Sequence, residues 1–183
     1  MTTTVYKFLA KGARGPLSGF TWPTPSGGNP GVWVEEERPL ELCARGLHVC
    51  RTIDLAHWIH EELWELEADG DPLEGLDCLV FRRARLLRRI DAWQDGAAKF
   101  NVASIEHSRR SAGSSSNDTV RGLLADAQWA AGEGLIAVSA YAAALAVATV
   151  ARPSERERAY RRERTWQANW ITREVIGTRA GDE

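Results

Sequence analysis

The sequence predicts an α+β fold, because the rhythm of its hydrophobic residues changes near Asp91. Before this position, apolar residues alternate in short runs bounded by Gly and Pro, which is typical of strands and turns. After it they recur every third or fourth residue, as along one face of a helix. We expect an N-terminal, mostly antiparallel sheet of about five strands with one short helix, covered by a C-terminal bundle of about four helices.

The chain has 183 residues, of which 44% are hydrophobic and 26% charged, and this composition is typical of a globular protein. A chain of this length makes about one domain. We therefore expect a single domain over residues 1–183, with a β-rich half at 1–90, a helical half at 91–176 and a flexible tail at 177–183.

The front half divides into short strands separated by turn residues. We expect strands at 5–9, 40–43, 46–50, 63–68 and 78–90. Repeated Pro and Gly make residues 18–34 a loop, and Thr52 can cap a short helix. The alternation in 63–68 points Trp64 and Leu66 inward and the glutamates outward.

The back half is predicted as helices at 92–110, 119–131 and 135–151, followed by one that begins near Ser154. Asp118 can cap the second helix, and Gly132 can end it. Ser154 and Glu157 form a capping-box pattern, in which each side chain satisfies a free amide at the start of the last helix.

The formal net charge of −2 and a pI near 6.1 disfavour a surface built to bind nucleic acid. Residues 1–76 carry 6 basic and 12 acidic side chains, whereas 77–110 carry 8 basic and 4 acidic ones. Arginines cluster at 82–89, but a strand divides them between two faces, and glutamates elsewhere can neutralise them. We expect a solvated edge there rather than a phosphate site.

The start of the chain carries no secretory hydrophobic segment, and its three cysteines cannot all pair within one chain. We therefore expect free thiols and a cytoplasmic location. Residues 135–151 are uncharged, but alanine drives membrane insertion weakly, so we expect a buried helix and no membrane span.

The densest group of reactive side chains lies at residues 43–50, where His48 and Cys50 point to the same side of a strand. Zinc sites usually combine two close pairs of ligands, and only one such pair is present, so we expect no metal. A thiolate beside an imidazole is also the working part of many acyl-transfer enzymes, which makes both residues candidate catalytic groups.

Glu65 and Glu67 share one face of a strand, where they could act as an acid/base pair, hold a ribose, or simply be solvated. The chain has eight tryptophans. We expect aromatic residues of the front half to bind a flat or cationic ligand, or else to anchor the core and the loops. The predicted ligand-binding residues are Tyr6, Trp22, Trp33 and Trp64.

Several motifs of the front half resemble those of a family of actinobacterial proteins. They are Tyr-Lys-Phe-Leu at 6–9, Gly-Phe-Thr-Trp-Pro at 19–23, the Cys, Gly-Leu-His and Cys pattern of 43–50, and Leu-Trp-Glu-Leu-Glu at 63–67. The helical half resembles that family only in its alanine richness. The resemblance implies kinship without an assigned activity.

The order of strands and short helix over residues 46–68 is also similar to the middle of ADP-ribosyltransferase folds, which bind NAD in a split sheet. We expect no cofactor from the other motifs, and this likeness makes NAD the one candidate. Residues 5–9 depart from that family, since they lack the Arg or His that it places on its first strand. Its catalytic glutamate also normally comes later than Glu65 or Glu67.

Two functions are consistent with the sequence, and it does not decide whether the protein is an enzyme. The first is the handling of a small molecule or nucleotide in a pocket between the tryptophans, His48 and Glu65. The second is a non-catalytic interaction protein that self-associates, as a homodimer for example, through its C-terminal helices.

Overall fold

The computed structural model describes residues 2–113 and 117–177. They belong to two compact units, Met1–Gln94 and Asp95–Glu183. The predicted α+β class, with a β-rich half followed by a helical half, is confirmed. That the helices cover the sheet, and that the two units make a single domain, stay predictions. Of the predicted tail 177–183, all but Gly177 lies outside the described residues.

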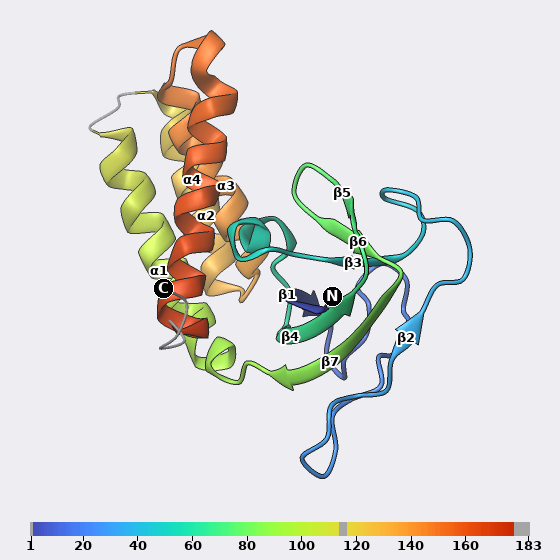
Figure 1. The fold of residues 1–183 in the computed structure, drawn as a ribbon. Coiled ribbons are helices and arrows are strands. Elements are labelled where there is room, and N and C mark those ends of the chain that lie inside the picture. The colour runs from blue at the N-terminus through green and yellow to red at the C-terminus, as the bar shows by residue number, and fades with distance from the viewer. Residues whose placement is uncertain (1, 114–116, 178–183) are drawn as a thin grey trace. The chain divides into compact units, whose positions relative to one another are not determined.

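The first unit is built from short antiparallel strands in two sheets (Figure 1). In the described residues they are β1 (Thr2–Leu9), β2 (Val34–Glu35), β3 (Leu47–Val49), β4 (Glu62–Asp69), β5 (Leu73–Glu74), β6 (Leu79–Phe81) and β7 (Arg83–Arg89). One sheet has the order β1-β4-β7-β2 and the other the order β3-β6-β5. An isolated bridge between Tyr6 and Cys50 connects β1 to the end of β3.

The prediction of one sheet with about five strands was therefore too simple. The predicted strand 78–90 is divided at Arg82 into β6 and β7, which belong to different sheets. The Arg82 guanidinium donates to the backbone oxygens of Glu36 and Glu37, both at 2.9 Å, and so binds a neighbouring loop at the bend. β2 and β5 are two residues long, which is too short for periodicity to reveal them.

Residues 40–43 are also not a strand, because the chain turns between Glu41 and Arg45, which are bridged. Cys43 has a φ of 61° within this turn, a left-handed conformation that a strand residue does not adopt. The predicted short helix is η1 (Thr52–Trp58), a 3-10 helix whose N-cap is Arg51, so Thr52 does not cap it.

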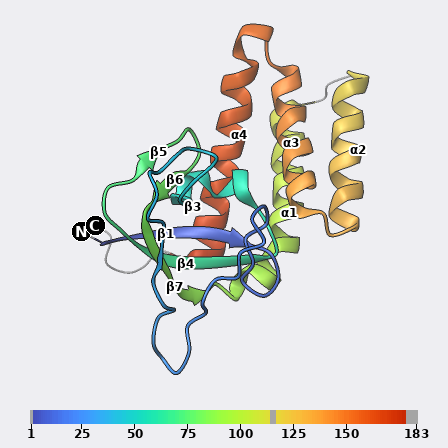
Figure 2. The ribbon, with the colours of Figure 1, turned by 90° about the vertical axis from the view of Figure 1, so that its right-hand side faces the viewer.

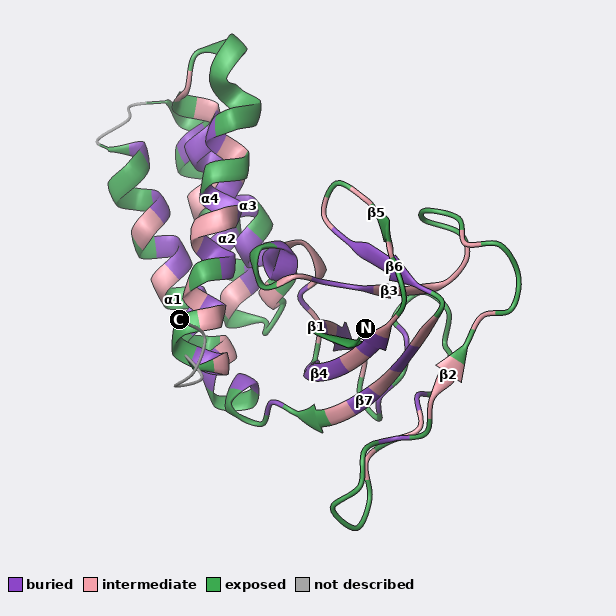
Figure 3. Cartoon of the chain, viewed as in Figure 1, coloured by how far each residue is buried: buried purple, intermediate pink, exposed green. Residues whose placement is uncertain are grey.

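The largest hydrophobic cluster of the first unit uses one face of each long strand. In the register of β1 and β4, Val5 lies opposite Leu66 and Lys7 opposite Trp64. Leu66 and Trp64 belong to the buried hydrophobic cluster, as predicted, together with Trp22 and residues of β3, β6 and β7. Figure 3 shows that β4 and β6 consist mainly of buried residues.

A β-bulge interrupts the pairing of β4 with β7 between Glu65 and Leu66. Glu65 lies opposite Arg88, whereas Leu66 lies opposite Leu86, so Leu87 is the extra residue. Because the side chains of a strand alternate, this insertion brings Arg88 to the same face as Arg85, three residues earlier.

The second unit is helical, and Figure 2 shows its helices alongside one another. The described helices are α1 (Ala92–Ala112), α2 (Asp118–Gly132), α3 (Ile136–Val150), η2 (Pro153–Glu155), α4 (Arg156–Ile171) and the π-helical turn η3 (Thr172–Ile176). Two predicted caps were wrong. Asn117, rather than Asp118, caps α2 by accepting from the Thr119 amide at 2.8 Å, and η2 leads into α4 in place of a cap by Ser154.

α3 is the central helix of this unit, as its alanine content predicts. Eight of its fifteen residues are buried. Ala142 and Ala143 pack with Ile105 of α1 and Ala127 of α2, because small side chains let neighbouring backbones approach closely. In the part of the chain that the structure describes, no helix is both long enough and apolar enough to cross a membrane.

The loop before β2 lies directly against β7 at Gly31. The Gly31 amide donates to the Leu86 oxygen at 2.8 Å, and a Cβ here would lie 2.2 Å from the Pro23 oxygen. We predict that Gly31→Ala lowers the free energy of unfolding by about 1–3 kcal/mol, since backbone atoms must move.

The matched control is Gly122→Ala in α2, where an added Cβ meets nothing within 4 Å. It should raise the free energy of unfolding by about 0.5–1 kcal/mol, because alanine favours the helix. Urea unfolding of both variants measures the difference. Equal effects would contradict the close packing of this loop.

Candidate functional site

The structure places two of the predicted ligand-binding residues in the hydrophobic core of the first unit. Trp22 and Trp64 are core residues, with only 4% and 7% of their surfaces exposed. The Trp64 indole donates to Glu62 at 3.0 Å. Trp64 and Glu65 are consecutive in β4 and point to opposite faces, so they cannot line the same pocket.

Trp33 lies partly exposed beside β2, where it packs against arginines of β7. The guanidinium carbons of Arg83 and Arg85 lie 4.3 and 4.5 Å from its ring centroid. Such contacts occupy the ring face that would otherwise attract a cationic ligand. Tyr6 is nearly buried on β1, opposite Glu65. Binding of a ligand by these aromatic residues stays a prediction.

Glu65 and Glu67 are ion-paired, and Glu65 is not on a solvated face as the alternation suggested. Glu65 is 1% exposed and accepts from Arg88 at 2.7 and 2.9 Å. Glu67 accepts from Arg85 at 2.6 and 2.8 Å. A buried carboxylate is tolerated in the interior when it has such a bonded partner. These contacts also show that the arginines of β7 have carboxylate partners, as the sequence suggested.

His48 is held by its own loop. Its Nε2 accepts from the Cys43 amide at 3.1 Å, which places the ring proton on Nδ1, 3.1 Å from the Gly46 oxygen. Burial lowers the pKa of His48, and the Lys7 ammonium lowers it further, against the effect of the Gly46 hydrogen bond. His48 is therefore a neutral ring that stabilises the turn, with both nitrogens engaged.

Cys50 is buried, and burial raises the pKa of its thiol strongly, although the Lys7 ammonium opposes this shift. A thiol of this kind is a poor nucleophile at neutral pH. The structure thus does not arrange His48 and Cys50 as a base and its nucleophile. Within the described residues, no three His, Cys, Asp or Glu side chains are grouped to hold a metal ion.

Lys7 is a residue that the sequence patterns did not single out. Its ammonium donates to the backbone oxygen of His48 and lies 5.8 Å from the Trp22 ring. Burial lowers the pKa of Lys7, and the neighbouring thiols of Cys50 and Cys78 oppose this shift. One charged residue in the apolar run 5–9 was the signal that could have found it.

Glu62 is a second buried charge that the sequence did not single out. Its carboxylate accepts from the amides of Gly12 and Ala13, both at 3.0 Å, and from the Trp64 indole at 3.0 Å. Both donors in the turn have positive φ, 77° for Gly12 and 55° for Ala13. Burial alone would raise the pKa of Glu62, but these hydrogen bonds outweigh it, so the pKa is lowered.

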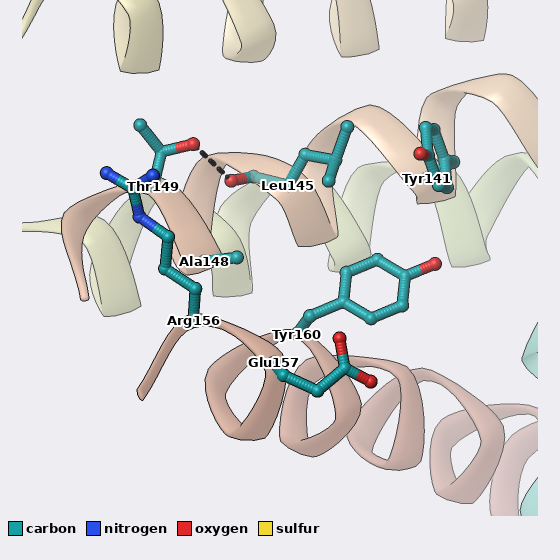
Figure 4. Close-up of a pocket in the computed structure, with 7 residues that line it drawn as sticks. All are labelled: Tyr141, Leu145, Ala148, Thr149, Arg156, Glu157 and Tyr160. Atoms are coloured by element: carbon teal, nitrogen blue, oxygen red, sulfur yellow. Dashed lines mark hydrogen bonds between the residues drawn. The ribbon is translucent and has the colours of Figure 1, made fainter. Parts of the chain in front are cut away.

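An open groove of about 420 Å³ lies between α3 and α4 in the second unit (Figure 4). It is lined by Tyr141, Leu145, Ala148, Thr149, Arg156, Glu157 and Tyr160. The two tyrosine rings meet edge to face with centroids 6.0 Å apart. The groove therefore has an aromatic part and, one to two helical turns away, an arginine and a glutamate.

Buried polar contacts hold the walls of this groove together. The Gln167 side chain of α4 donates to the backbone oxygen of Ala140 in α3 at 2.9 Å, and Arg164 donates to Gln167 at 2.9 Å. The Arg164 guanidinium also lies 6.0 Å from the Tyr160 ring. Burial lowers the pKa of Arg164, against the effect of the nearby tyrosines. Because these polar groups are buried and bonded, the position of α4 on α3 is well defined.

α4 is bound to α1 by a second polar group. His107 Nδ1 lies 2.9 and 3.0 Å from the two oxygens of the buried Glu163 carboxylate, and Ser108 donates to the same carboxylate at 3.1 Å. The His107 ring stacks on Trp166 with centroids 3.8 Å apart. α4 is thus attached to both α1 and α3.

With this geometry described, the chain can be compared with known proteins. No protein-family model, no curated protein and no solved structure matches the chain. The structure is that of an α+β protein. Its β-rich unit contains ion pairs between neighbouring strands, and its helical unit has a groove lined in part by tyrosines. The resemblances to an actinobacterial family and to ADP-ribosyltransferases stay hypotheses.

We predict that Glu62→Gln lowers the free energy of unfolding at neutral pH by about 1–3 kcal/mol, because an amide replaces the charged acceptor of three hydrogen bonds. The pKa of Glu62 is lower in the folded chain than its ordinary value of 4.5. The stabilisation is therefore fully present above the unfolded pKa and is lost as the pH falls through the folded one.

Urea unfolding of Glu62→Gln and wild type from pH 7 down to pH 3 would measure this, and the difference between them should shrink on acidification. Glu74→Gln is the control, since the Glu74 side chain is 73% exposed. A difference that is constant over the whole range would contradict the assigned role of the Glu62 carboxylate.

Proposed function

We propose that the protein is a non-catalytic interaction protein that self-associates through the α3–α4 face of its helical unit. The observation that carries the proposal is an uncharged helix whose outer side meets solvent. None of the fifteen residues of α3 is charged. Solvent-facing helix positions of a globular protein normally carry charged or polar side chains.

One stripe of uncharged side chains on α3 is exposed at Val138 and Tyr141 and partly buried at Leu145 and Thr149. Val138, Tyr141, Leu145 and Thr149 follow each other at spacings of three or four residues, which places them on one side of the helix. Val138 and Tyr141 are 50% and 51% exposed. Exposed apolar side chains that gather in this way mark interaction surfaces more often than isolated ones do.

The groove beside this stripe offers the kind of anchor that protein interfaces use. Tyrosine is enriched among residues that dominate binding energy, since it buries a large rigid ring and retains a polar end. Tyr141 and Tyr160 come from different helices and are held in place by the buried contacts beneath α4. The binding surface is therefore formed in advance.

A second copy of the chain is the partner that fits these features. An uncharged stripe that packs on its own two-fold mate buries no charge and creates no like-charge contact. Arg156 and Glu157 are consecutive in α4 and both line the groove. A two-fold axis reverses their order in the second copy, so that each arginine can face a glutamate.

The groove itself does not favour catalysis. Its lining contains one carboxylate, Glu157, and this group accepts from Arg161 at 2.6 Å. The opening is also wide, whereas sites for small molecules usually enclose most of the ligand. Both features support a macromolecular partner over a substrate.

We predict that wild type is a dimer at micromolar concentration and that Val138→Asp makes it monomeric, because the variant buries two charges in the interface. The molar mass measured by light scattering during size-exclusion chromatography reports the result. The substitution should raise the dissociation constant of the dimer at least about tenfold, which corresponds to a loss of about 1.4 kcal/mol of binding free energy.

Val102→Asp is the matched control. Val102 lies on α1 and is 58% exposed, so this variant introduces the same change from valine to aspartate outside the stripe. It should remain dimeric. Circular dichroism should show that both variants are folded. A wild-type protein that is monomeric at these concentrations would make the proposal untenable.

A further inference from the structure

Two of the three cysteines end neighbouring strands of the smaller sheet. Cys50 directly follows β3, and Cys78 directly precedes β6. Both are buried free thiols, each 3% exposed, whereas Cys43 is exposed. Their position relative to each other follows from the pairing of the two strands.

The register places these cysteines opposite one another. β3 and β6 are antiparallel, with His48 opposite Val80 and Val49 opposite Leu79. One more step in the same register sets Cys50 opposite Cys78. Residues directly opposite in an antiparallel pair point to the same side of the sheet, so the two thiols share one face.

Backbone hydrogen bonds identify which type of pair this is. The Cys50 amide and oxygen bond to Tyr6 of β1, at 2.7 and 2.9 Å, and the Cys78 oxygen accepts from Gly75 at 2.8 Å. Both backbones are therefore directed away from the space between the cysteines. In such a non-hydrogen-bonded pair the Cα atoms are about 4.5 Å apart, within the range of about 4.4–6.8 Å that a disulfide spans.

We propose that Cys50 and Cys78 are a modification site, a cross-strand dithiol that a hydroperoxide oxidises to an intramolecular disulfide without rearrangement of the sheet. This inference is independent of the proposed self-association. It also revises the expectation that the cysteines are all free thiols, since two of the three can pair although all three cannot.

The reaction balances with one hydroperoxide per disulfide. Cys78, which directly follows the exposed Leu76 and the partly buried Asp77, loses its proton, and its sulfur attacks a peroxide oxygen. The O–O bond breaks, giving a sulfenic acid and, with hydrogen peroxide, one water. The Cys50 thiolate then attacks this sulfur and expels hydroxide, which takes up a proton to become the second water.

Local charge influences the rate of this reaction. Burial raises the pKa of both thiols, which slows oxidation, whereas the Lys7 ammonium lowers the pKa of Cys50 and Arg51 lowers that of Cys78. The pair is therefore slow to react but well placed to close once one sulfur is oxidised.

The test uses the full chain with Cys43→Ser, which removes the exposed thiol. After treatment with hydrogen peroxide, the protein is denatured and its remaining thiols are alkylated. Intact mass should fall by about 2 Da with no alkyl label added, and peptide mapping should find Cys50 linked to Cys78. Dithiothreitol should restore two labelled thiols, and the oxidised form should unfold at a higher urea concentration.

The controls are Cys43→Ser combined with Cys50→Ser or with Cys78→Ser, each of which should never lose 2 Da. Two thiols that remain alkylatable after complete exposure to peroxide would overturn the proposal. So would separate oxidation of each sulfur to a sulfinic acid, because opposed thiols should react with each other first. In wild type, a disulfide that contains Cys43 would overturn it as well.

Discussion

The central strand β4 is paired on both edges and buried on both faces, and this double burial governs the first unit. A charged side chain in such a strand is tolerated only with a bonded partner. Glu62 accepts hydrogen bonds from amides of the turn after β1, and Glu65 and Glu67 accept them from arginines of β7. These three carboxylates therefore bind different residues, and each of these contacts also positions a turn or a strand.

The contrast between what the sequence predicted and what it missed in β4 has a simple origin. Alternation depends on adjacent residues, so it correctly directed Trp64 and Leu66 inward. The burial of Glu65 depends on Arg88, which is 23 positions away and reaches it only through strand pairing. For the same reason, the division of residues 78–90 at Arg82 was not visible, because the loop oxygens that Arg82 binds lie more than forty residues earlier.

The functional residues show the same limit. The tryptophans and the Cys–His pair suggested a pocket because of their residue types. Residue type does not determine the direction in which a side chain points, and Trp64 and Glu65 lie on opposite faces of β4. His48 bonds to its own loop, a local arrangement that required the positive φ of Cys43 to be known. In the helices, the uncharged character of α3 was visible in the sequence. The meeting of Tyr141 with Tyr160 across two helices was not.

The bulge between β4 and β7 has a consequence for the lengths that this fold can accept. Leu87 is the residue that lets Arg85 and Arg88 face the same row of glutamates, although they are an odd number of positions apart. Because Leu87 is the residue without a partner on β4, its loss would leave an uninterrupted ladder in which Arg88 still lies opposite Glu65. Descendants of this chain can therefore lose one residue between Arg85 and Arg88 and retain both ion pairs with β4, whereas one more inserted residue would need a wider bulge or would turn Arg88 to the opposite face.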